Sequence, residues 1–569
     1  MQGKSWAGVL CAGMCVFAFG QAQAMTKAEV HAKNLGRIAP TQLATRLNLH
    51  TGNTLVADKT IHLHNGRQLV RKRQFYRGVP VYGRSVVVER DARGSVLSVD
   101  GEVERNLSTE LASVTPRLTA VEARLALQRA HGQLRQATRE GKAKLYVYPQ
   151  KHGAAKLVYR VSYLVGSGNH LSRPTAIVDA NTGKVIKQWN GLTTGRRPPG
   201  GGTAVPVQAM GVGGNQFTGL YYYDGSNSTN HATLSVTRKG NVCYMTNPDV
   251  TTYNLANGGW VAPWSFGCSG TNPANWVSTG DAANGAFSPV DDAHHFGQVV
   301  HDMYENWFGA PPLKNGDGSP MQLHMWVHYG TNYENAFWDG SEMVFGDGDQ
   351  YFYPFVSLDI TGHEISHGFT EQHSGLEYTG QSGGMNEAFS DMAGQAVVYY
   401  NDGSNDFLVG EDILKPGTDQ LLGLNALRDM CQPERDGLSI GNAADYYDGL
   451  DVHYSSGVYN KAFCLLAKTA GWDTRKAFEV FHDANALYWG PEETFDSGAC
   501  GVEQAATDRG YATADVAAAF TGVGVTCPAP TLADGSTTDD GSIGPLTPTR
   551  TRAGSRGSVQ PATVSTRLR

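Results

Sequence analysis

The chain has 569 residues, of which 40% are hydrophobic and only 17% are charged. This length predicts three or four folding units at about 150 residues each, and the apolar content excludes an intrinsically disordered chain. The net charge of −7 hides a split: residues 25–206 carry 29 Lys and Arg against 11 Asp and Glu, whereas residues 207–529 carry 11 against 39. Such an acidic half excludes nucleic acid and membrane surfaces as partners, and the opposite charges favour two parts that bind each other.

The N-terminus has the pattern of a secretory signal peptide. Lys4 gives a positive start, Trp6 to Phe19 is a short apolar run, and Ala22-Gln23-Ala24 supplies a cleavage site. The apolar run is too short to span a bilayer, and no later segment approaches about 20 apolar residues. We therefore expect residues 1–24 to be removed and the protein to be secreted.

Strands and one helix are expected between residues 58 and 190. Residues 117–132 have an amphipathic pattern, and Thr119 as N-cap with Glu122 three residues later predicts the start of a helix. Short β-branched and aromatic stretches broken by glycines predict strands. These strands fall within residues 58–105 and at residues 144–148, 155–164 and 175–188.

A Pro/Gly-rich linker follows at residues 195–207, where the charge changes sign, and it contains the dibasic pair Arg196-Arg197. Such a segment is solvated and open to proteolysis, so we place a domain boundary and a processing region there. Strands and turns are expected to about residue 285, a helix at 289–308, strands at 320–356 and mainly helices from 358 to about 522. Residues 530–569 are rich in Thr, Ser, Gly and Pro, which predicts a disordered or removable tail.

Removal of the signal peptide would leave six cysteines, and an even number in an exported chain predicts disulfides. Six cysteines allow many pairings. Proximity along the chain favours Cys243–Cys268 and Cys500–Cys527, which leaves Cys431–Cys464. No C-x-x-C pair occurs, so neither a thiol redox site nor a cysteine zinc knuckle is expected.

Residues 361–368 contain the most informative motif, with His363 and His367 on one side of a predicted helix. Histidines four residues apart share a helix face, so both imidazoles can reach one Zn²⁺. Glu364 lies beside them, where it can take a proton from an attacking water. Two histidines on a polar helix face can also be incidental, so the interpretation requires a third ligand.

A second segment, residues 384–391, supplies that ligand. Glu387 and Asp391 are four residues apart, so one can bind zinc while the other accepts a hydrogen bond from a ligand imidazole. Three protein ligands leave a fourth position for water, which is the arrangement of catalytic zinc. Farther on, Asp448 precedes His453, and a histidine oriented by a carboxylate can stabilise a developing oxyanion, although a lone histidine is more often structural.

With these residues assembled, residues 207–527 resemble the thermolysin-like metallopeptidases, most closely the pseudolysin/vibriolysin branch. The 19 residues between His367 and Glu387 match the spacing of that family, and residues 335–349 are similar to its edge-strand segment. The resemblance implies an α+β, two-lobed peptidase. Its β-rich N-terminal lobe would comprise residues 208–357 and its mainly helical C-terminal lobe residues 358–527, followed by a low-complexity tail at residues 528–569.

The resemblance also implies roles for the residues at matching positions. His363, His367 and Glu387 would bind one zinc ion, and Glu364 would be the general base. Tyr378 and His453 would stabilise the tetrahedral intermediate, with Asp448 orienting His453. Asp391 and Asn386 would hold the two histidine ligands in place.

Substrate contacts follow from the same resemblance. Asn335 and Ala336 would pair with the substrate backbone by strand addition, and Arg428 would hold a substrate carbonyl. An apolar S1′ pocket would favour cleavage before bulky hydrophobic residues, although the same side chains could be ordinary core. The residues at the pocket positions are Phe352, Phe355, Ile360 and Leu427.

A structural calcium ion is also implied by the resemblance. Asp359, Asp406 and Glu411 match acidic positions of the family's calcium site. Val398 stands where the family has a glutamate, and Gln395 replaces an acid common in the nearest branch. The loss of a shared carboxylate favours one Ca²⁺ rather than a double site.

Upstream, residues 25–110 resemble the fungalysin/thermolysin propeptide motif and residues 111–194 a PepSY module. Together they would be an α+β propeptide that acts as an intramolecular chaperone and inhibitor. The basic propeptide and the acidic peptidase would attract each other over about a Debye length.

The leading hypothesis is a secreted zinc endopeptidase of the elastase type, made as an autoprocessed prepro-enzyme and monomeric when mature. It would act on proteins and peptides. The second hypothesis is a zinc exopeptidase, because Gly383-Gly384-Met-Asn-Glu387 superficially resembles an aminopeptidase motif. That motif here overlaps the third ligand instead of preceding it. A third hypothesis, an inactive binding protein, conflicts with the intact set of Glu364, Glu387 and His453.

Overall fold

The computed structural model describes residues 26–528, except residues 37, 39, 50, 64–65, 151–153, 167–171, 192–204, 227–231, 257–261 and 424. The predicted signal peptide, residues 529–569 of the predicted tail and most of the predicted linker therefore lie outside the described residues. The last residues of the predicted linker are described, and they begin strand β10 (Val205–Ala209). Within the described ranges, no helix combines the length and the apolar character needed to cross a membrane.

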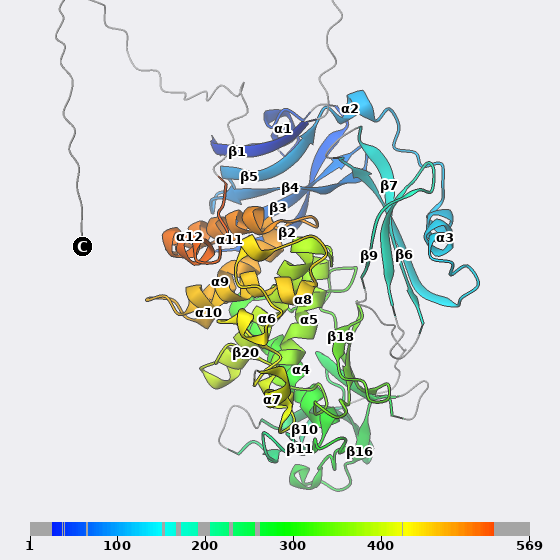
Figure 1. Ribbon diagram of the computed structural model, residues 1–569, viewed down its shortest axis with the longest axis vertical. Helices are drawn as coiled ribbons and strands as arrows, with labels where there is room; N and C mark the ends of the chain where they lie inside the picture. Colours follow the sequence, from blue (N-terminus) through cyan, green and yellow to red (C-terminus); the bar gives the residue numbers. More distant parts are fainter. Residues whose placement is uncertain are drawn as a thin grey trace, which may run out of the picture. The chain divides into compact units, whose positions relative to one another are not determined.

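Residues 26–190 form one nine-stranded sheet in the order β1-β5-β4-β6-β7-β8-β9, with β3 paired to β4 and β2 to β3 (Figure 1). All pairings are antiparallel except one parallel bridge, Val81 to Val147, which joins β4 to β6 and so links the two halves of the sheet. We call this part of the chain the prodomain, after the propeptide that the sequence predicts here. Its strands are β1 (Thr26–Gly36), β2 (Asn53–His62), β3 (Gln68–Tyr76), β4 (Val79–Arg90), β5 (Val96–Arg105), β6 (Thr138–Tyr148), β7 (Lys156–Val165), β8 (Pro174–Asp179) and β9 (Val185–Asn190).

The predicted helix of the prodomain is confirmed as α3 (Ala120–Ala130). The Thr119 side chain accepts the backbone N–H of Glu122, whose carboxylate in turn accepts the backbone N–H of Thr119, so the capping box read from the sequence is complete. Ala123 and Leu127 of this helix are fully buried against β6, β7 and β8. Two short helices, α1 (Pro40–Arg46) and α2 (Leu107–Glu110), complete the prodomain.

The rest of the described chain begins with a β-rich lobe. One sheet has the order β10-β13-β14-β16, a second β15-β17-β19-β18, and β11 pairs with β12. Strand β18 lies at the edge of the second sheet, paired antiparallel with β19 only. The strands are β11 (Gly211–Gly213), β12 (Tyr221–Tyr223), β13 (Leu234–Lys239), β14 (Val242–Tyr244), β15 (Val250–Asn254), β16 (Ser265–Gly267), β17 (Leu323–Tyr329), β18 (Ala336–Trp338) and β19 (Glu342–Gly346).

Helices dominate the rest, and α4 (Pro289–Phe308) has the bounds predicted from the sequence. The helical lobe contains α5 (Leu358–Gln372), α6 (Gly380–Asp402), α7 (Thr418–Leu422), α8 (Val452–Ser455), α9 (Gly457–Ala467), α10 (Thr474–Asp483), α11 (Phe495–Arg509) and α12 (Thr513–Thr521), with a short ribbon of β20 (Leu408–Val409) and β21 (Arg428–Asp429). One large hydrophobic core runs through these helices and the β-rich lobe. The predicted α+β fold is confirmed.

Two glycines explain how closely α5 and α6 approach each other, side by side in Figure 1. A Cβ on Gly362 of α5 would lie 2.8 Å from Val397, and a Cβ on Gly394 of α6 would lie 2.6 Å from the carbonyl oxygen of Asp359. Neither position can accept a larger side chain without separating the helices. This contact fixes the distance between the histidine motif on α5 and Glu387 on α6.

All three predicted disulfides are confirmed. Cys243 is bonded to Cys268, Cys431 to Cys464 and Cys500 to Cys527, with Cα–Cα distances of 5.5, 5.3 and 4.8 Å. Cys243 and Cys464 are buried in the large core, and the third pair joins α11 to the end of the described chain.

Candidate metal centre and active site

His363, His367 and Glu387 form the only set of three or more metal-ligating side chains that converge within the described residues. The Nε2 atoms of the two histidines are 3.0 Å apart, and the Glu387 carboxylate lies 3.5 Å from the first and 3.4 Å from the second. All three side chains are buried. Nitrogen and carboxylate donors in this number match a zinc site with one position left open.

Hydrogen bonds on the far side of each ring fix its orientation. The Nδ1 atom of His363 is 2.8 Å from Asp391 Oδ1, and that of His367 is 2.8 Å from Asn386 Oδ1. Both partners are acceptors, so each Nδ1 carries the proton and each Nε2 lone pair points toward the common centre. Two lone pairs facing each other at 3.0 Å would repel, and a cation between them would relieve that repulsion. The residues therefore fit a bound zinc ion.

Glu364 lies beside this centre with one carboxylate oxygen unused. Its Oε2 atom is buried and has no hydrogen-bond partner among the described residues, whereas the backbone N–H of Trp338 in β18 supports the carboxylate. Burial, more than the Glu387 charge, raises the pKa of Glu364 to about 7. A carboxylate in such a position can accept a proton from water and return it near neutral pH.

Helix α8 brings His453 to the other side of Glu387. A Cβ on Gly383 or Gly384 of α6 would lie 2.4 Å from Val452 or Ser455, so the glycine pair provides the close contact on which α8 packs. His453 Nε2 is consequently 3.6 Å from Glu387 and 3.4 Å from the Tyr378 hydroxyl, which donates a hydrogen bond to Glu387. The glycine pair thus has a packing role in this site.

The prediction that Asp448 orients His453 is wrong. His453 Nδ1 is bound at 2.8 Å to Asp451 Oδ1, and the same oxygen accepts the backbone N–H of His453. Asp451 is the N-cap of α8, and an N-cap carboxylate reaches the backbone two residues later and, here, the imidazole of the same residue. Asp448 is exposed, three residues before the cap.

Asp391 is held from three directions. Arg428 donates to it through Nε at 2.8 Å and through Nη2 at 2.6 Å, and Asn460 of α9 donates through Nδ2 at 2.8 Å. Arg428 and then His363 lower the pKa of Asp391 far below its usual value, although burial opposes the shift. The predicted residue Arg428 thus contacts Asp391, the carboxylate that orients the ligand His363. Asn460 had no predicted role, and a single buried asparagine on an apolar helix gives no signal of one.

The predicted substrate residues lie at the start of β18, on α5 and in the segments around residues 352–355 and 427. Asn335 directly precedes edge strand β18, and its side-chain oxygen accepts the backbone N–H of Ala336. Ile360 lies one turn before His363 on α5, and the rings of Phe352 and Phe355 are 5.2 Å apart. Phe355 and Ile360 are buried in the large core, and Phe352 and Leu427 pack against it.

The predicted calcium residues line one cavity of about 360 Å³. Asp359, Asp406 and Glu411 are joined there by Asp402 and Asp412, although within the described residues no three of these carboxylates converge as the zinc ligands do. Burial and the neighbouring carboxylates raise the pKa of Asp412 to about 7. Gln395 and Val398 also line this cavity. The Gln395 amide donates to the Leu408 carbonyl and accepts from the Phe407 N–H and from Asn405.

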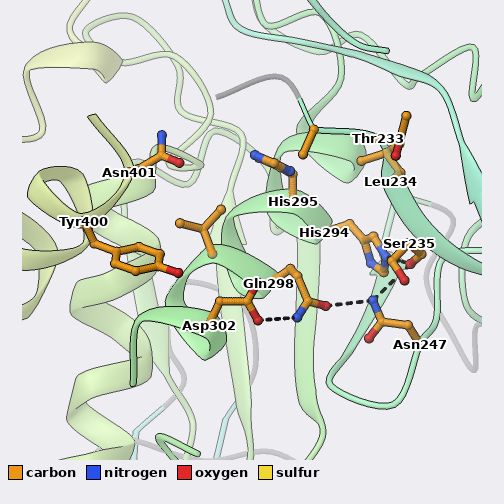
Figure 2. Close-up of a pocket in the computed structure, with 12 residues that line it drawn as sticks. Thr233, Leu234, Ser235, Asn247, His294, His295, Gln298, Asp302, Tyr400 and Asn401 are labelled. Atoms are coloured by element: carbon orange, nitrogen blue, oxygen red, sulfur yellow. Dashed lines mark hydrogen bonds between the residues drawn. The ribbon is translucent and has the colours of Figure 1, made fainter. Parts of the chain in front are cut away.

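A second cavity of similar volume lies beside α4 and is lined by residues of β13, α4 and the end of α6 (Figure 2). Its polar side chains bond to one another: Asn247 donates to Gln298, which donates to Asp302. None of the predicted site residues lines this cavity.

Comparison with known proteins places the chain in a family. The family model described as "Thermolysin metallopeptidase, catalytic domain" matches residues 223–371, and that described as "Thermolysin metallopeptidase, alpha-helical domain" matches residues 374–525. The "Fungalysin/Thermolysin Propeptide Motif" matches residues 53–103 of the prodomain. The chain belongs to the thermolysin family of metallopeptidases.

Individual relatives agree with this assignment. The chain is 46% identical over 475 residues to the hemagglutinin/proteinase of Vibrio cholerae, covering 82% of this chain and 73% of that protein. It is 44% identical to the neutral protease of Vibrio proteolyticus, covering 82% and 72%, and 32% identical to thermolysin of Bacillus caldolyticus, covering 83% and 86%. Among solved structures, a precursor of protealysin from Serratia proteamaculans is 29% identical with a TM-score of 0.40, covering 50% of this chain and 90% of that one. The family models and the relatives that are at least 32% identical show that the chain is a zinc metalloendopeptidase with an N-terminal propeptide.

Proposed function

We propose that the protein is a secreted zinc endopeptidase that cleaves proteins before bulky hydrophobic residues and removes its own prodomain. One observation carries the catalytic part of the proposal. The three ligand side chains His363, His367 and Glu387 converge beside the unpaired carboxylate oxygen of Glu364. This places a base next to an open metal position, which is what peptide hydrolysis by water requires.

The protein residues divide the proton transfers between them. Zinc, when bound, supplies a Lewis acid that polarises the scissile carbonyl. Glu364 takes one proton from water as the water oxygen attacks the carbonyl carbon, and it delivers this proton to the amine nitrogen as the C–N bond breaks. Tyr378 and His453 donate hydrogen bonds to the oxyanion. Burial keeps the pKa of Tyr378 well above its usual value, so its hydroxyl retains the proton that it donates.

Substrate would bind as an added strand along β18. The free edge of this strand offers backbone groups, and Asn335 and Ala336 stand at its start. Arg428, which reaches the site through Asp391, would hold a substrate carbonyl. The aromatic pair Phe352 and Phe355 with Ile360 and Leu427 would accept the bulky side chain after the scissile bond.

The prodomain would fold the peptidase, inhibit it and leave after cleavage in residues 195–207. Its side chains hold the residue next to Tyr378: the Tyr82 hydroxyl donates to the buried Glu377 at 2.5 Å, and Lys187 is ion-paired with the same carboxylate. We propose that residues 1–24 direct secretion and that the mature peptidase of about residues 208–527 is a monomer. One Ca²⁺ bound by Asp359, Asp406 and Glu411 would neutralise the acidic cavity beside them.

Cleavage of peptides blocked at both ends tests this proposal. A set that varies only the residue after one internal bond, through Gly, Ala, Phe and Leu, should be cut at that bond, with Phe and Leu fastest. Cutting without preference would refute the S1′ assignment. Failure to cut any blocked peptide, with release of N-terminal residues from unblocked ones, would support the exopeptidase alternative instead.

Autoprocessing has its own test. The secreted wild-type chain should have lost residues 25–206 when its mass is measured, whereas Glu364→Ala should retain them. A Glu364→Ala chain that matures normally would show that another protease cuts the linker.

A further inference from the structure

His373, at the end of α5, is the point where three cations of the prodomain meet the peptidase. Lys59 of β2 places its Nζ atom 3.0 Å from His373 Nε2. From β3, Arg71 Nη1 donates to the His373 carbonyl oxygen at 3.2 Å, and Arg73 Nη2 donates to the same oxygen at 3.5 Å. The role of this histidine is separate from that of the metal ligands, since it lies six residues beyond His367.

Geometry fixes the protonation of the His373 ring. Its Nδ1 atom is 2.8 Å from the Phe369 carbonyl oxygen, which can only accept, so Nδ1 carries a hydrogen. The Lys59 ammonium can only donate, so Nε2 must present its lone pair. The imidazole is therefore neutral when the prodomain is in place, and it is stacked on Phe369 with ring centroids 3.9 Å apart.

The groups packed around His373 are buried and cannot readily move away from its ring. Arg71 is 5% exposed and also donates to the Trp489 carbonyl oxygen at 3.0 Å, so its charge cannot move away from His373. Leu69 and Val87, from the two adjacent prodomain strands, are buried in the hydrophobic core of the peptidase. A proton added to Nε2 would break the bond to Lys59 and place a positive charge against buried cations.

We propose that His373 makes the hold of the prodomain on the peptidase sensitive to protons: the neutral ring binds Lys59, and the protonated ring repels it. The proposal rests on the proposed function only in treating residues 26–190 as a removable prodomain. It assigns the release of that prodomain to acidification, in addition to cleavage of the linker.

Other ionisable groups surround His373. Burial and then Lys314 lower the pKa of Lys59 only to about 8, so most Lys59 side chains are charged at pH 7.5 and nearly all at pH 5.5. Burial lowers the pKa of His482, on α10, to about 4, so it stays neutral. Two carboxylates complete the surroundings: Asp58 is paired with Arg73, and Asp483 is paired with Arg509.

The sign of the pH dependence follows from linkage. Burial and then Lys59 lower the pKa of His373 well below 6.5 in the precursor, whereas without the prodomain we expect a value near the ordinary one of about 6.5. Association of the prodomain thus excludes a proton, and it weakens as the pH falls through about 6.5. From pH 7.5 to pH 5.5 the equilibrium constant for docking of the prodomain on the peptidase, within the uncut chain, should fall about tenfold.

Hydrogen exchange on the full-length Glu364→Gln precursor tests this without relying on peptidase activity. The hydrogen-exchange protection factors of amides in β3 and in residues 369–378, corrected for the intrinsic exchange rate at each pH, should fall about tenfold from pH 7.5 to pH 5.5. His373→Gln should abolish this fall, because an amide can donate to Phe369 and accept from Lys59 but cannot be protonated in this range. His31→Gln is the matched control: this exposed prodomain histidine, bound to Asp100, should leave the fall unchanged.

Lys59→Met provides a second variant in case His373→Gln does not fold. It removes the cation opposite Nε2, so protection should be lower at both pH values and should change less between them. The same pH dependence in His373→Gln as in its parent would overturn the proposal. Since exchange is measured on an uncut and inactive chain, this failure is distinct from a failure of the proposed peptidase activity.

Discussion

Replacement of Asp451 by Asn, with Asp448→Asn as its matched control, tests how His453 is oriented. In Asp451→Asn the carboxylate that holds His453 Nδ1 at 2.8 Å becomes a neutral amide. A hydrogen bond to a charged group contributes about 1.5–3 kcal/mol, but the two side chains are 46% and 56% exposed, so water reduces this to about 1–1.5 kcal/mol. That difference corresponds to a loss of about five- to tenfold in kcat, because the proposed contact of His453 with the oxyanion would form mainly in the transition state.

The assay is initial-rate hydrolysis of a blocked peptide by the mature enzymes over a range of substrate concentrations. Asp451→Asn should lower kcat and leave KM nearly unchanged, and Asp448→Asn should match the wild type in both. Equal losses in the two variants, or a loss confined to Asp448→Asn, would refute the assignment of the orienting role to Asp451.

Three further predictions follow from the same structure. Asn460→Ala removes one donor to Asp391 and should weaken zinc binding by about 10- to 100-fold in chelator competition. Asn485→Ala, the control, removes a buried amide bonded to Ser374 and Thr370 and should destabilise the fold without changing zinc affinity. Equal zinc affinities in the two variants would contradict this prediction. Removal of the Cys500–Cys527 disulfide by replacing both cysteines with Ser should lower the free energy of unfolding by about 3 kcal/mol, because the bond closes a loop of 27 residues. Denaturant titration measures this change. An unchanged unfolding midpoint would show that the end of the chain stays bound without the disulfide. A calcium-selective chelator should lower Tm at neutral pH and leave the zinc content unchanged. A Tm that does not depend on calcium would refute the assignment of the acidic cavity as a calcium site.

The local parts of the site could be predicted because they depend on periodicity. Residues four apart on a helix share a face whatever the rest of the chain does, so His363 and His367 were paired from the sequence alone. The same holds for the capping box of α3, whose two partners are three residues apart. The helix α4 has the bounds predicted from the sequence, and in the structure Ser288 and Gly309 cap its two ends.

The remaining parts depend on contacts between distant segments, for which the sequence has no local signal. The choice between Asp448 and Asp451 depends on where α8 begins, and both residues are aspartates within five positions of His453 along the chain. Asn460 meets Asp391 across 69 residues, and Lys59 meets His373 across 314. In each case a common polar residue acquires its role from tertiary packing, which no pattern of neighbours along the chain reveals.

Zinc content and blocked-peptide hydrolysis, measured together, test the central claim most directly. Wild type, Glu364→Gln and Glu387→Gln would each be cut at Arg196-Arg197 by trypsin, which is then inhibited, so that all three are compared without a covalent prodomain. The account predicts one zinc per chain and rapid hydrolysis for the wild type, retained zinc with about a thousandfold slower hydrolysis for Glu364→Gln, and loss of both zinc and activity for Glu387→Gln. Wild-type rates in Glu364→Gln, or a fully active wild-type enzyme without zinc, would contradict it.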